Sequence, residues 1–172
     1  MVVENALGAF GEGGLPGGGD IHVDEEGEWF YRGTKIVRED IIELFLEHLV
    51  LGADGRFVIE WRGSHCGIDA ADTPFVVTRV DREEGPGDSG VTLKVLLKHL
   101  PAPQTLDPQT LTVGAANILY CRIQNGRFPA RFSRPAYYQL AEWIVEEEES
   151  GSFYLEFGNK RHVIGQALSG SA

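Results

Sequence analysis

The sequence predicts an α+β protein built from two repeated modules, each a small antiparallel sheet with one packed helix. The first observation is an internal repeat, because residues 38–61 align without a gap on residues 134–157, a shift of 96 positions. The second is that in both copies the apolar spacing changes from helical to alternating. A repeat of this kind indicates one supersecondary unit present twice, and each module reads as hairpin, helix, strand, strand.

The first module is predicted to contain a hairpin, a helix and two strands. The helix is expected over residues 39–51, because apolar residues recur there at helical spacing. Glu39 and Asp40 place negative charge in its first turn, where the helix dipole favours it. β-Branched and aromatic residues dominate the strands. The remaining predicted segments are the hairpin 21–31 and the strands 56–61 and 75–80.

The second module opens with a hairpin over residues 119–132. Asn125-Gly126 stands between two alternating apolar runs, which is a strong signal for a tight turn. Ser133 is a suitable N-cap for a second helix with Pro135 in its first turn. We expect this helix to reach Val145 and to end in the solvated acidic run 146–149, with a closing hairpin over residues 153–164.

Composition divides the chain further. Residues 8–19 hold seven glycines in twelve positions, which is typical of a flexible leader. Residues 91–97 favour a strand, because two prolines follow closely at 101 and 103. The predicted organisation is a disordered leader 1–19, a first module 20–85, connecting strands and a loop 86–118, a second module 119–165 and a flexible tail 166–172.

The charge balance limits the classes of partner. A net charge of −11 argues against broad binding to nucleic acid or to an anionic membrane, since phosphates require a positive surface. The sequence contains no run of 18 apolar residues, the length that a bilayer-spanning helix needs. The N-terminus lacks the pattern of a secretory signal. Two cysteines far apart in the sequence are typical of reduced thiols in a cytoplasmic protein. We therefore expect a cytoplasmic location.

Several short motifs occur in an order that resembles known families. They are Asp24-x-x-Gly27-x-Trp29-Phe30-Tyr31-x-Gly33, Leu44-Phe45 in the helix, Gly55-Arg56-Phe57 and Asp72-Thr73-Pro74-Phe75. The chain over residues 20–165 resembles the bacterial family called domain of unknown function 1285. With Cys66-Gly67 it also resembles the family called domain of unknown function 4505, and residues 131–140 fit a late helix in both.

One departure bears on the choice between these families. The first family carries a Thr-Pro step after the strand 56–61, where this chain has Arg62-Gly63-Ser64, and this difference favours the second family. Either resemblance implies a two-module α+β fold with repeated elements. Neither implies an established activity or catalytic residues.

A group of arginines in the second module is the main charge anomaly. Residues 86–134 carry six Lys and Arg against two Asp and Glu, in a chain that is otherwise acidic. Arg127 and Arg131 are expected on one face of the returning strand, because an even number of positions separates them. Planar guanidinium groups suit phosphate and carboxylate. The predicted ligand-binding residues are Tyr120, Arg122, Arg127, Arg131 and Arg134, and the alternative is that these arginines pair with the protein's own acids, including Glu142 and Glu146.

A second polar cluster offers a different chemistry. Cysteine and histidine together supply a nucleophile and a base, or with carboxylates a metal site. His65 and Cys66 are adjacent, however, and adjacent strand residues point to opposite faces. The alternative cluster comprises His65, Cys66, Asp69, Asp72 and His162. Its structural interpretation is a buried Cys66, a surface His65 and an Asp72 that serves a turn.

The sequence contains no phosphate-binding loop, dinucleotide fingerprint, zinc-protease motif or nucleophile elbow. We expect no cofactor, no metal and no catalysis. The hypothesis is a binding or regulatory module that recognises an anionic small molecule or a protein partner. The alternative hypothesis is a hydrolase or metal-dependent enzyme that uses His65, Asp69 and Asp72.

Overall fold

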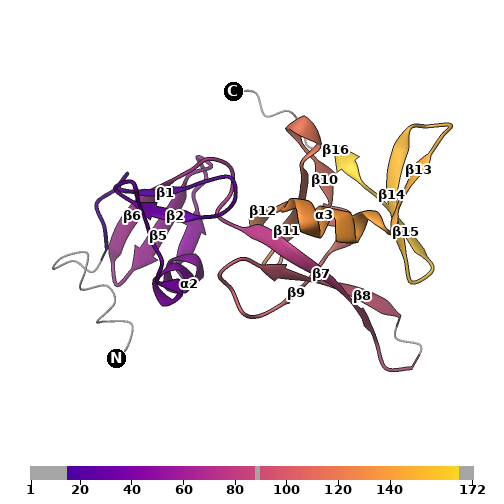
Figure 1. Ribbon diagram of the computed structural model, residues 1–172, viewed down its shortest axis with the longest axis horizontal. Helices are drawn as coiled ribbons and strands as arrows, with labels where there is room; N and C mark the ends of the chain where they lie inside the picture. The colour runs from indigo at the N-terminus through magenta and orange to yellow at the C-terminus, as the bar shows by residue number, and fades with distance from the viewer. Residues whose placement is uncertain (1–14, 88–89, 167–172) are drawn as a thin grey trace. The chain divides into compact units, whose positions relative to one another are not determined.

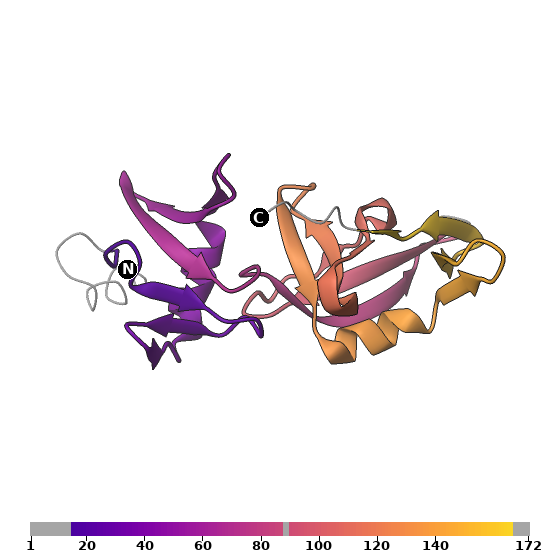
Figure 2. The ribbon, with the colours of Figure 1, turned by 90° about the horizontal axis from the view of Figure 1, so that it is seen from above.

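The computed structural model describes residues 15–87 and 90–166 (Figures 1 and 2). The chain has the predicted α+β class and consists of two compact units, Met1–Pro74 and Phe75–Ala172. Among the described residues, neither α-helix is long and apolar enough to cross a membrane.

Within residues 15–74, the first unit is a six-stranded sheet with one α-helix. The strand order is β3-β2-β1-β6-β5-β4, and all neighbours are antiparallel except β1 and β6, which run parallel. The sheet is therefore mixed, whereas the prediction was antiparallel. The elements are β1 (Ile21–Val23), β2 (Trp29–Tyr31), β3 (Thr34–Lys35), α2 (Glu39–Glu47), β4 (Leu49–Leu51), β5 (Phe57–Trp61) and β6 (Ser64–Ala70).

The core of this unit lies between α2 and one face of the sheet (Figure 2). The ring of Phe45 on α2 lies 5.9 Å from that of Trp29 on β2, and both side chains are fully buried. Burying a large apolar side chain stabilises the fold by about 1.5–3 kcal/mol. The apolar stripe predicted from the sequence is thus the buried face of α2, whose buried residues are Ile41, Ile42, Leu44, Phe45 and Leu46.

The end of the predicted leader is part of this fold. Pro16 is buried, and the Gly19 N–H donates to the carbonyl of Gly67 on β6 at 3.2 Å. The Asp20 N–H donates to the Gly17 carbonyl at 3.1 Å and closes a turn ahead of β1. Residues 15–19 therefore belong to the first unit. The rest of the predicted leader, residues 1–14, and most of the predicted tail lie outside the described residues.

Within its described residues, the second unit contains two sheets and one α-helix (Figure 1). A seven-stranded sheet has the order β16-β10-β11-β12-β7-β8-β9, and a three-stranded sheet has the order β13-β14-β15. The elements are β7 (Val76–Glu84), β8 (Val91–Leu97), β9 (Gln104–Thr105), the 3-10 turn η2 (Pro108–Thr110), β10 (Thr112–Val113), the 3-10 turn η3 (Ala115–Asn117), β11 (Leu119–Ile123), β12 (Phe128–Phe132), α3 (Arg134–Ala141), β13 (Ile144–Glu147), β14 (Ser152–Phe157), β15 (Lys160–Val163) and β16 (Gly165–Gln166).

Helix α3 follows β12 directly and packs on β7. The Ser133 hydroxyl accepts from the Ala136 N–H at 3.4 Å, so Ser133 is the predicted N-cap. Within the helix, the Gln139 Oε1 accepts from the Val80 N–H of β7 at 2.8 Å. The Gln139 side chain thus supplies the hydrogen-bond acceptor that β12 does not supply at Val80, because β12 pairs with β7 only as far as Val77.

Both helices end earlier than the sequence predicted. Helix α2 stops at Glu47, and residues 49–51 form β4 paired with β5. Helix α3 stops at Ala141, and the acidic run predicted as its tail begins within β13, which pairs with β14. The helical predictions over residues 48–51 and 142–149 were therefore wrong, because pairing with a neighbouring strand outweighs local helical spacing.

The division between the units also differs from the predicted boundary at residue 85. Strand β7 belongs to the second unit, because it pairs with β8 along most of its length and with β12 at its start. The predicted connecting region 86–118 supplies β8, β9 and β10 of the seven-stranded sheet. Both β7 and this region are therefore integral to the second unit.

The two units share a pairing pattern. In the first, β1 pairs antiparallel with β2 and parallel with the end of β6, where Val23 meets Ala70. In the second, β10 pairs antiparallel with β11 and parallel with β16, where Val113 meets Gln166. A duplicated unit would show this pattern with β10 as its first strand. Duplication itself stays a prediction.

Candidate functional site

An open depression in the second unit is the candidate site. It lies over β10, β11 and the start of β12, with a volume of about 550 Å³. Sites for small molecules typically occupy about 300–1,000 Å³. The residues that line it are Gln109, Thr110, Thr112, Tyr120, Cys121, Arg122, Gly126 and Pro129.

The alternation of β11 and β12 places two polar side chains in this depression. Successive strand residues point to opposite faces, and one face of the hairpin is buried as core. Tyr120 and Arg122 project from the other face of β11, where Tyr120 pairs with Arg131 and Arg122 with Pro129 across the strands. The buried face consists of Leu119, Cys121, Ile123, Phe128, Ala130 and Phe132.

Arg122 and Pro129 form a close cross-strand pair. Pro129 has no N–H, and the Arg122 N–H donates away from β12, to the Thr110 hydroxyl at 3.0 Å. The two residues therefore make a non-hydrogen-bonded pair, in which side chains of antiparallel strands approach most closely. The stem of Arg122 is thus held beside the proline ring.

The turn η2 forms a fixed wall of the depression. The Asp107 carboxylate accepts from the Gln109 N–H at 3.0 Å, which caps the turn. The Thr110 hydroxyl donates to the Asp107 carbonyl at 2.7 Å while accepting from Arg122. These bonds fasten the turn to β11 and hold Gln109 and Thr110 in place.

The ring of Tyr120 lies against the backbone of Gly114. A Cβ atom at Gly114 would lie 2.7 Å from Cε2 of Tyr120, closer than van der Waals contact allows. The backbone of Gly114 has φ −92°, so the restriction comes from the ring and not from the chain conformation. The Gly114 N–H donates to the Ile118 carbonyl at 2.8 Å, which closes the loop between β10 and β11. Gly114 therefore makes room for the ring.

The structure separates the predicted arginines. Arg122 lines the depression, and Arg131 lies on the same face of the hairpin opposite Tyr120. Arg127 falls in the turn 124–127, and its guanidinium carbon lies 5.2 Å from the centre of the Phe128 ring. The prediction that Arg127 shares a strand with Arg131 was wrong, because the turn is one residue longer than expected. Arg134 is the first residue of α3.

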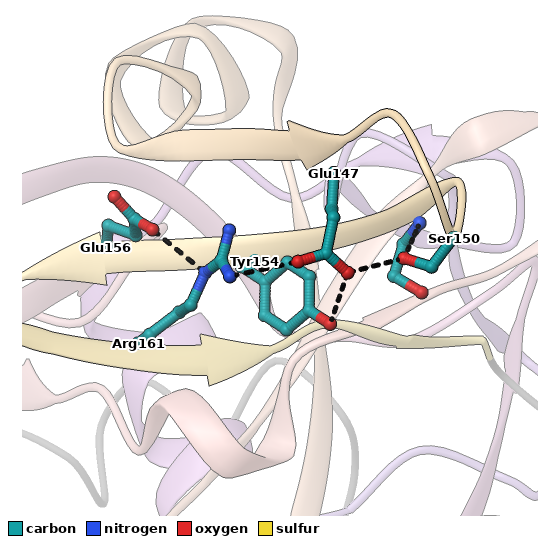
Figure 3. Close-up of polar contacts among 6 residues, drawn as sticks. Glu147, Ser150, Tyr154, Glu156 and Arg161 are labelled. Atoms are coloured by element: carbon teal, nitrogen blue, oxygen red, sulfur yellow. Dashed lines mark hydrogen bonds and ion pairs between the residues drawn. The ribbon is translucent and has the colours of Figure 1, made fainter.

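An ion-pair network lies on the three-stranded sheet. The Arg161 guanidinium contacts Glu147 at 3.2 Å and Glu156 at 2.9 Å, and lies 4.0 Å from the centre of the Tyr154 ring (Figure 3). A hydrogen bond from the Ser150 hydroxyl and the charge of Arg161 hold the pKa of Glu147 below its usual value of 4.5. Part of the acidic surplus is therefore neutralised here.

Arg122 has a different environment. Within residues 15–87 and 90–166, the structure shows no ion pair for Arg122, Arg127 or Arg134, and none for Glu142 or Glu146. The interpretation that Glu142 and Glu146 neutralise these three arginines is therefore not supported. Arg122 therefore combines a guanidinium that has no ion pair among the described residues with a place in the depression.

The alternative polar cluster does not assemble within the first unit. His65 is exposed on β6, with Nε2 3.3 Å from the Glu60 carboxylate. Cys66 points to the other face, where burial raises the pKa of its thiol, and Sγ lies 3.7 Å from the Gly17 carbonyl. Asp69 meets a residue that sequence reasoning missed, His22 of β1, with Nδ1 and Oδ2 3.0 Å apart.

The remaining members of this cluster lie elsewhere. Asp72 is half-buried beyond the end of β6, and His162 of β15 stacks on Phe157 with 5.5 Å between ring centres. The part of the chain that the structure describes contains no group of three or more His, Cys, Asp or Glu side chains arranged to hold a metal ion.

At the depression itself, burial raises the pKa of Cys121 to about 12, so this thiol stays protonated.

Comparison with known proteins defines the fold. No protein-family model and no curated protein sequence matches the chain. A crystal structure of a DUF1285 family protein from Silicibacter pomeroyi DSS-3 matches with a TM-score of 0.69 and 24% identity, covering 88% of this chain and 82% of that one. A DUF1285 family protein from Shewanella baltica OS155 matches with a TM-score of 0.58 and 18% identity, covering 72% and 91% respectively.

The chain therefore has the α+β fold found in DUF1285 family proteins. The predicted resemblance to the domain of unknown function 1285 is confirmed at the level of the fold. The resemblance to the domain of unknown function 4505 stays a prediction.

Sequence reasoning found part of this depression and missed the rest. The sequence analysis named Tyr120 and Arg122 as ligand-binding residues, and both line the depression. The wall formed by Gln109 and Thr110 comes from the 3-10 turn η2, in the region 86–118 that was predicted to hold connecting strands and a loop. The sequence alone did not indicate that Gly114 contacts Tyr120. Its one indication is a glycine close to a strand that contains an aromatic residue.

Proposed function

We propose that this protein is a non-catalytic binding module that recognises an anionic small molecule at the depression over β10, β11 and β12. The observation that carries the proposal is Arg122, a guanidinium that lines a preformed depression and has no ion pair within the described residues. Guanidinium groups bind phosphate and carboxylate in a bidentate manner.

Neutral groups around Arg122 supply the remaining contacts. Gln109 and Thr112 line the same depression, and Arg131 adds a second positive charge on the same face of the hairpin. A hydrogen bond to a charged group contributes about 1.5–3 kcal/mol. Because the site is open to water, we expect dissociation constants between about 1 mM and 1 μM, equivalent to about −4 to −8 kcal/mol.

Two features support recognition rather than chemistry. The thiol at the depression, Cys121, has a pKa of about 12 and is therefore a poor nucleophile. His65 and Asp69 each face a different partner in the first unit instead of each other. The proposal includes a cytoplasmic location, supported by two cysteines that are both free.

The test is anion-dependent thermal stabilisation with matched arginine variants. Phosphate, pyrophosphate and citrate are titrated against the full chain, and stabilisation of about 1.4 kcal/mol is expected at ten times the dissociation constant. Arg122→Gln removes the charge from the depression and abolishes the effect. Arg134→Gln removes a charge at the start of α3 that also has no ion pair within the described residues, and it leaves the stabilisation intact. Equal stabilisation of both variants, or none of the wild type, contradicts the proposal.

A further inference from the structure

The depression offers a ring-binding surface beside its positive charge. Tyr120, Arg122 and Pro129 line it together, with the tyrosine and the arginine on the same strand two positions apart. We propose that the ligand carries a planar aromatic ring directly attached to its anionic group, as in an aryl phosphate or an aryl carboxylate. This inference rests on the proposed function and specifies the chemistry of the same site.

The positions around Tyr120 determine how near the ring and the anion are. Arg131 faces Tyr120 directly across the β11–β12 pair, and Thr112 faces it across β10 and β11. Directly opposed residues lie about 5 Å apart, and residues two apart on one strand about 7 Å. A ring seated on Tyr120 therefore has two arginine-bearing positions within about 5 to 7 Å, which fits an anion joined to the ring without a long linker.

Tyr120 is positioned before any ligand arrives. Its ring packs over Gly114, where a single added methyl group would come within 2.7 Å. A side chain that is already immobilised loses little rotational freedom on binding, so its contact contributes more to affinity. Gly114 is thus a positioning residue, since it contacts the tyrosine and not the ligand.

The opposite side of the depression also suits a flat group. The pyrrolidine ring of Pro129 lies beside the stem of Arg122, and Gly126 contributes no side chain at the turn. A guanidinium plane accepts an aromatic face. Aromatic contacts add about 0.5–1.5 kcal/mol, which corresponds to an affinity gain of about 2- to 12-fold over the anion alone.

The experiment compares matched probes by isothermal titration calorimetry on the full chain. Phenyl phosphate is expected to bind about 2- to 12-fold more tightly than inorganic phosphate, whereas cyclohexyl phosphate, which has a similar size but no flat ring, gains less. Benzoate against acetate repeats the comparison with a carboxylate and identifies which anion the site prefers. Equal affinities for phenyl phosphate and inorganic phosphate overturn the ring proposal.

Variants separate the ring from the charge. Gly114→Ala displaces the Tyr120 ring and is expected to remove the preference for phenyl phosphate while leaving the affinity for inorganic phosphate unchanged. Gly165→Ala on β16 is the control, because its added methyl group makes only an ordinary contact with Thr112 at 3.7 Å. Tyr120→Phe retains the preference and Tyr120→Leu loses it.

The two levels of the proposal fail in different ways. A preference for phenyl phosphate that survives both Gly114→Ala and Tyr120→Leu overturns the ring site, even if Arg122→Gln abolishes binding. Absence of any binding by phosphate and phenyl phosphate overturns the proposed function together with this inference. Binding of inorganic phosphate that depends on Arg122, with no gain from the ring, overturns only the inference.

Discussion

The hydrogen bond between Gln139 and Val80 gives a quantitative test of how α3 is held on the sheet. The Val80 amide is in a residue only 5% exposed, and its N–H donates to Gln139 Oε1 at 2.8 Å. Substituting Gln139→Leu keeps the side-chain size but removes the acceptor, which leaves a buried N–H without a partner. An unsatisfied buried donor costs about 1–3 kcal/mol, so we expect a loss of that size in the free energy of unfolding.

The assay is urea unfolding combined with amide hydrogen exchange at Val80. With a dependence of about 1–3 kcal/mol per M urea, the expected loss lowers the unfolding midpoint by about 1 M. Gln139→Glu is the control, because a carboxylate oxygen still accepts the bond, and its loss should be less than half as large. An unchanged midpoint in Gln139→Leu, with Val80 exchanging at the wild-type rate, refutes the reasoning.

Three further predictions concern packing, cysteine reactivity and pH. Phe128→Ala empties a fully buried site in the second unit and should reduce the free energy of unfolding by about 3–5 kcal/mol, measured by urea denaturation. Cys121 should resist iodoacetamide at pH 8 until urea unfolds the protein, since its pKa of about 12 keeps the thiol protonated, and rapid alkylation of the native protein would contradict this. The pKa of Glu147 is lowered by the Ser150 hydroxyl and by Arg161, so its contribution to stability is present above pH 4.5 and is lost as the pH falls through the lower, folded value. Glu147→Gln should flatten that acid-side loss in thermal unfolding between pH 5 and pH 2, and an unaltered pH profile would exclude this contribution.

Local chemistry in the sequence predicted individual elements well. Asn125-Gly126 marked the β11–β12 turn, and Ser133 caps α3 as expected. Helix α2 begins at Glu39, where the sequence placed its first acidic turn. These features depend on neighbouring residues only, so the sequence contains the information that fixes them.

Features that depend on distant residues were not predictable in this way. Leu49 and Val50 fit both a helical stripe and an alternating strand, and only pairing with β5 decides for the strand. The parallel pairing of β1 with β6 joins Ile21 to Ile68, which no local pattern indicates. The same reason explains why the sequence did not predict a seven-stranded sheet that includes β7 and β8.

The candidate site also combines features that depend on neighbouring residues with features that depend on distant ones. Tyr120 and Arg122 follow from alternation along one strand, whereas Thr110 reaches the site through a turn held by side-chain hydrogen bonds. Arg127 was misplaced by a single residue of turn length, which changes the element to which it belongs. The candidate depression combines residues of three strands with two turns, so the alternation along β11 predicts only part of it.

The most direct test of the proposed function is an NMR titration of the isotope-labelled chain with phenyl phosphate. We predict saturable chemical-shift changes at the Arg122 guanidinium and at the amides of Thr112 and Tyr120, with the first unit unaffected. Saturable changes confined to other residues, or no change at millimolar ligand, would contradict the assignment of an anion site to this depression.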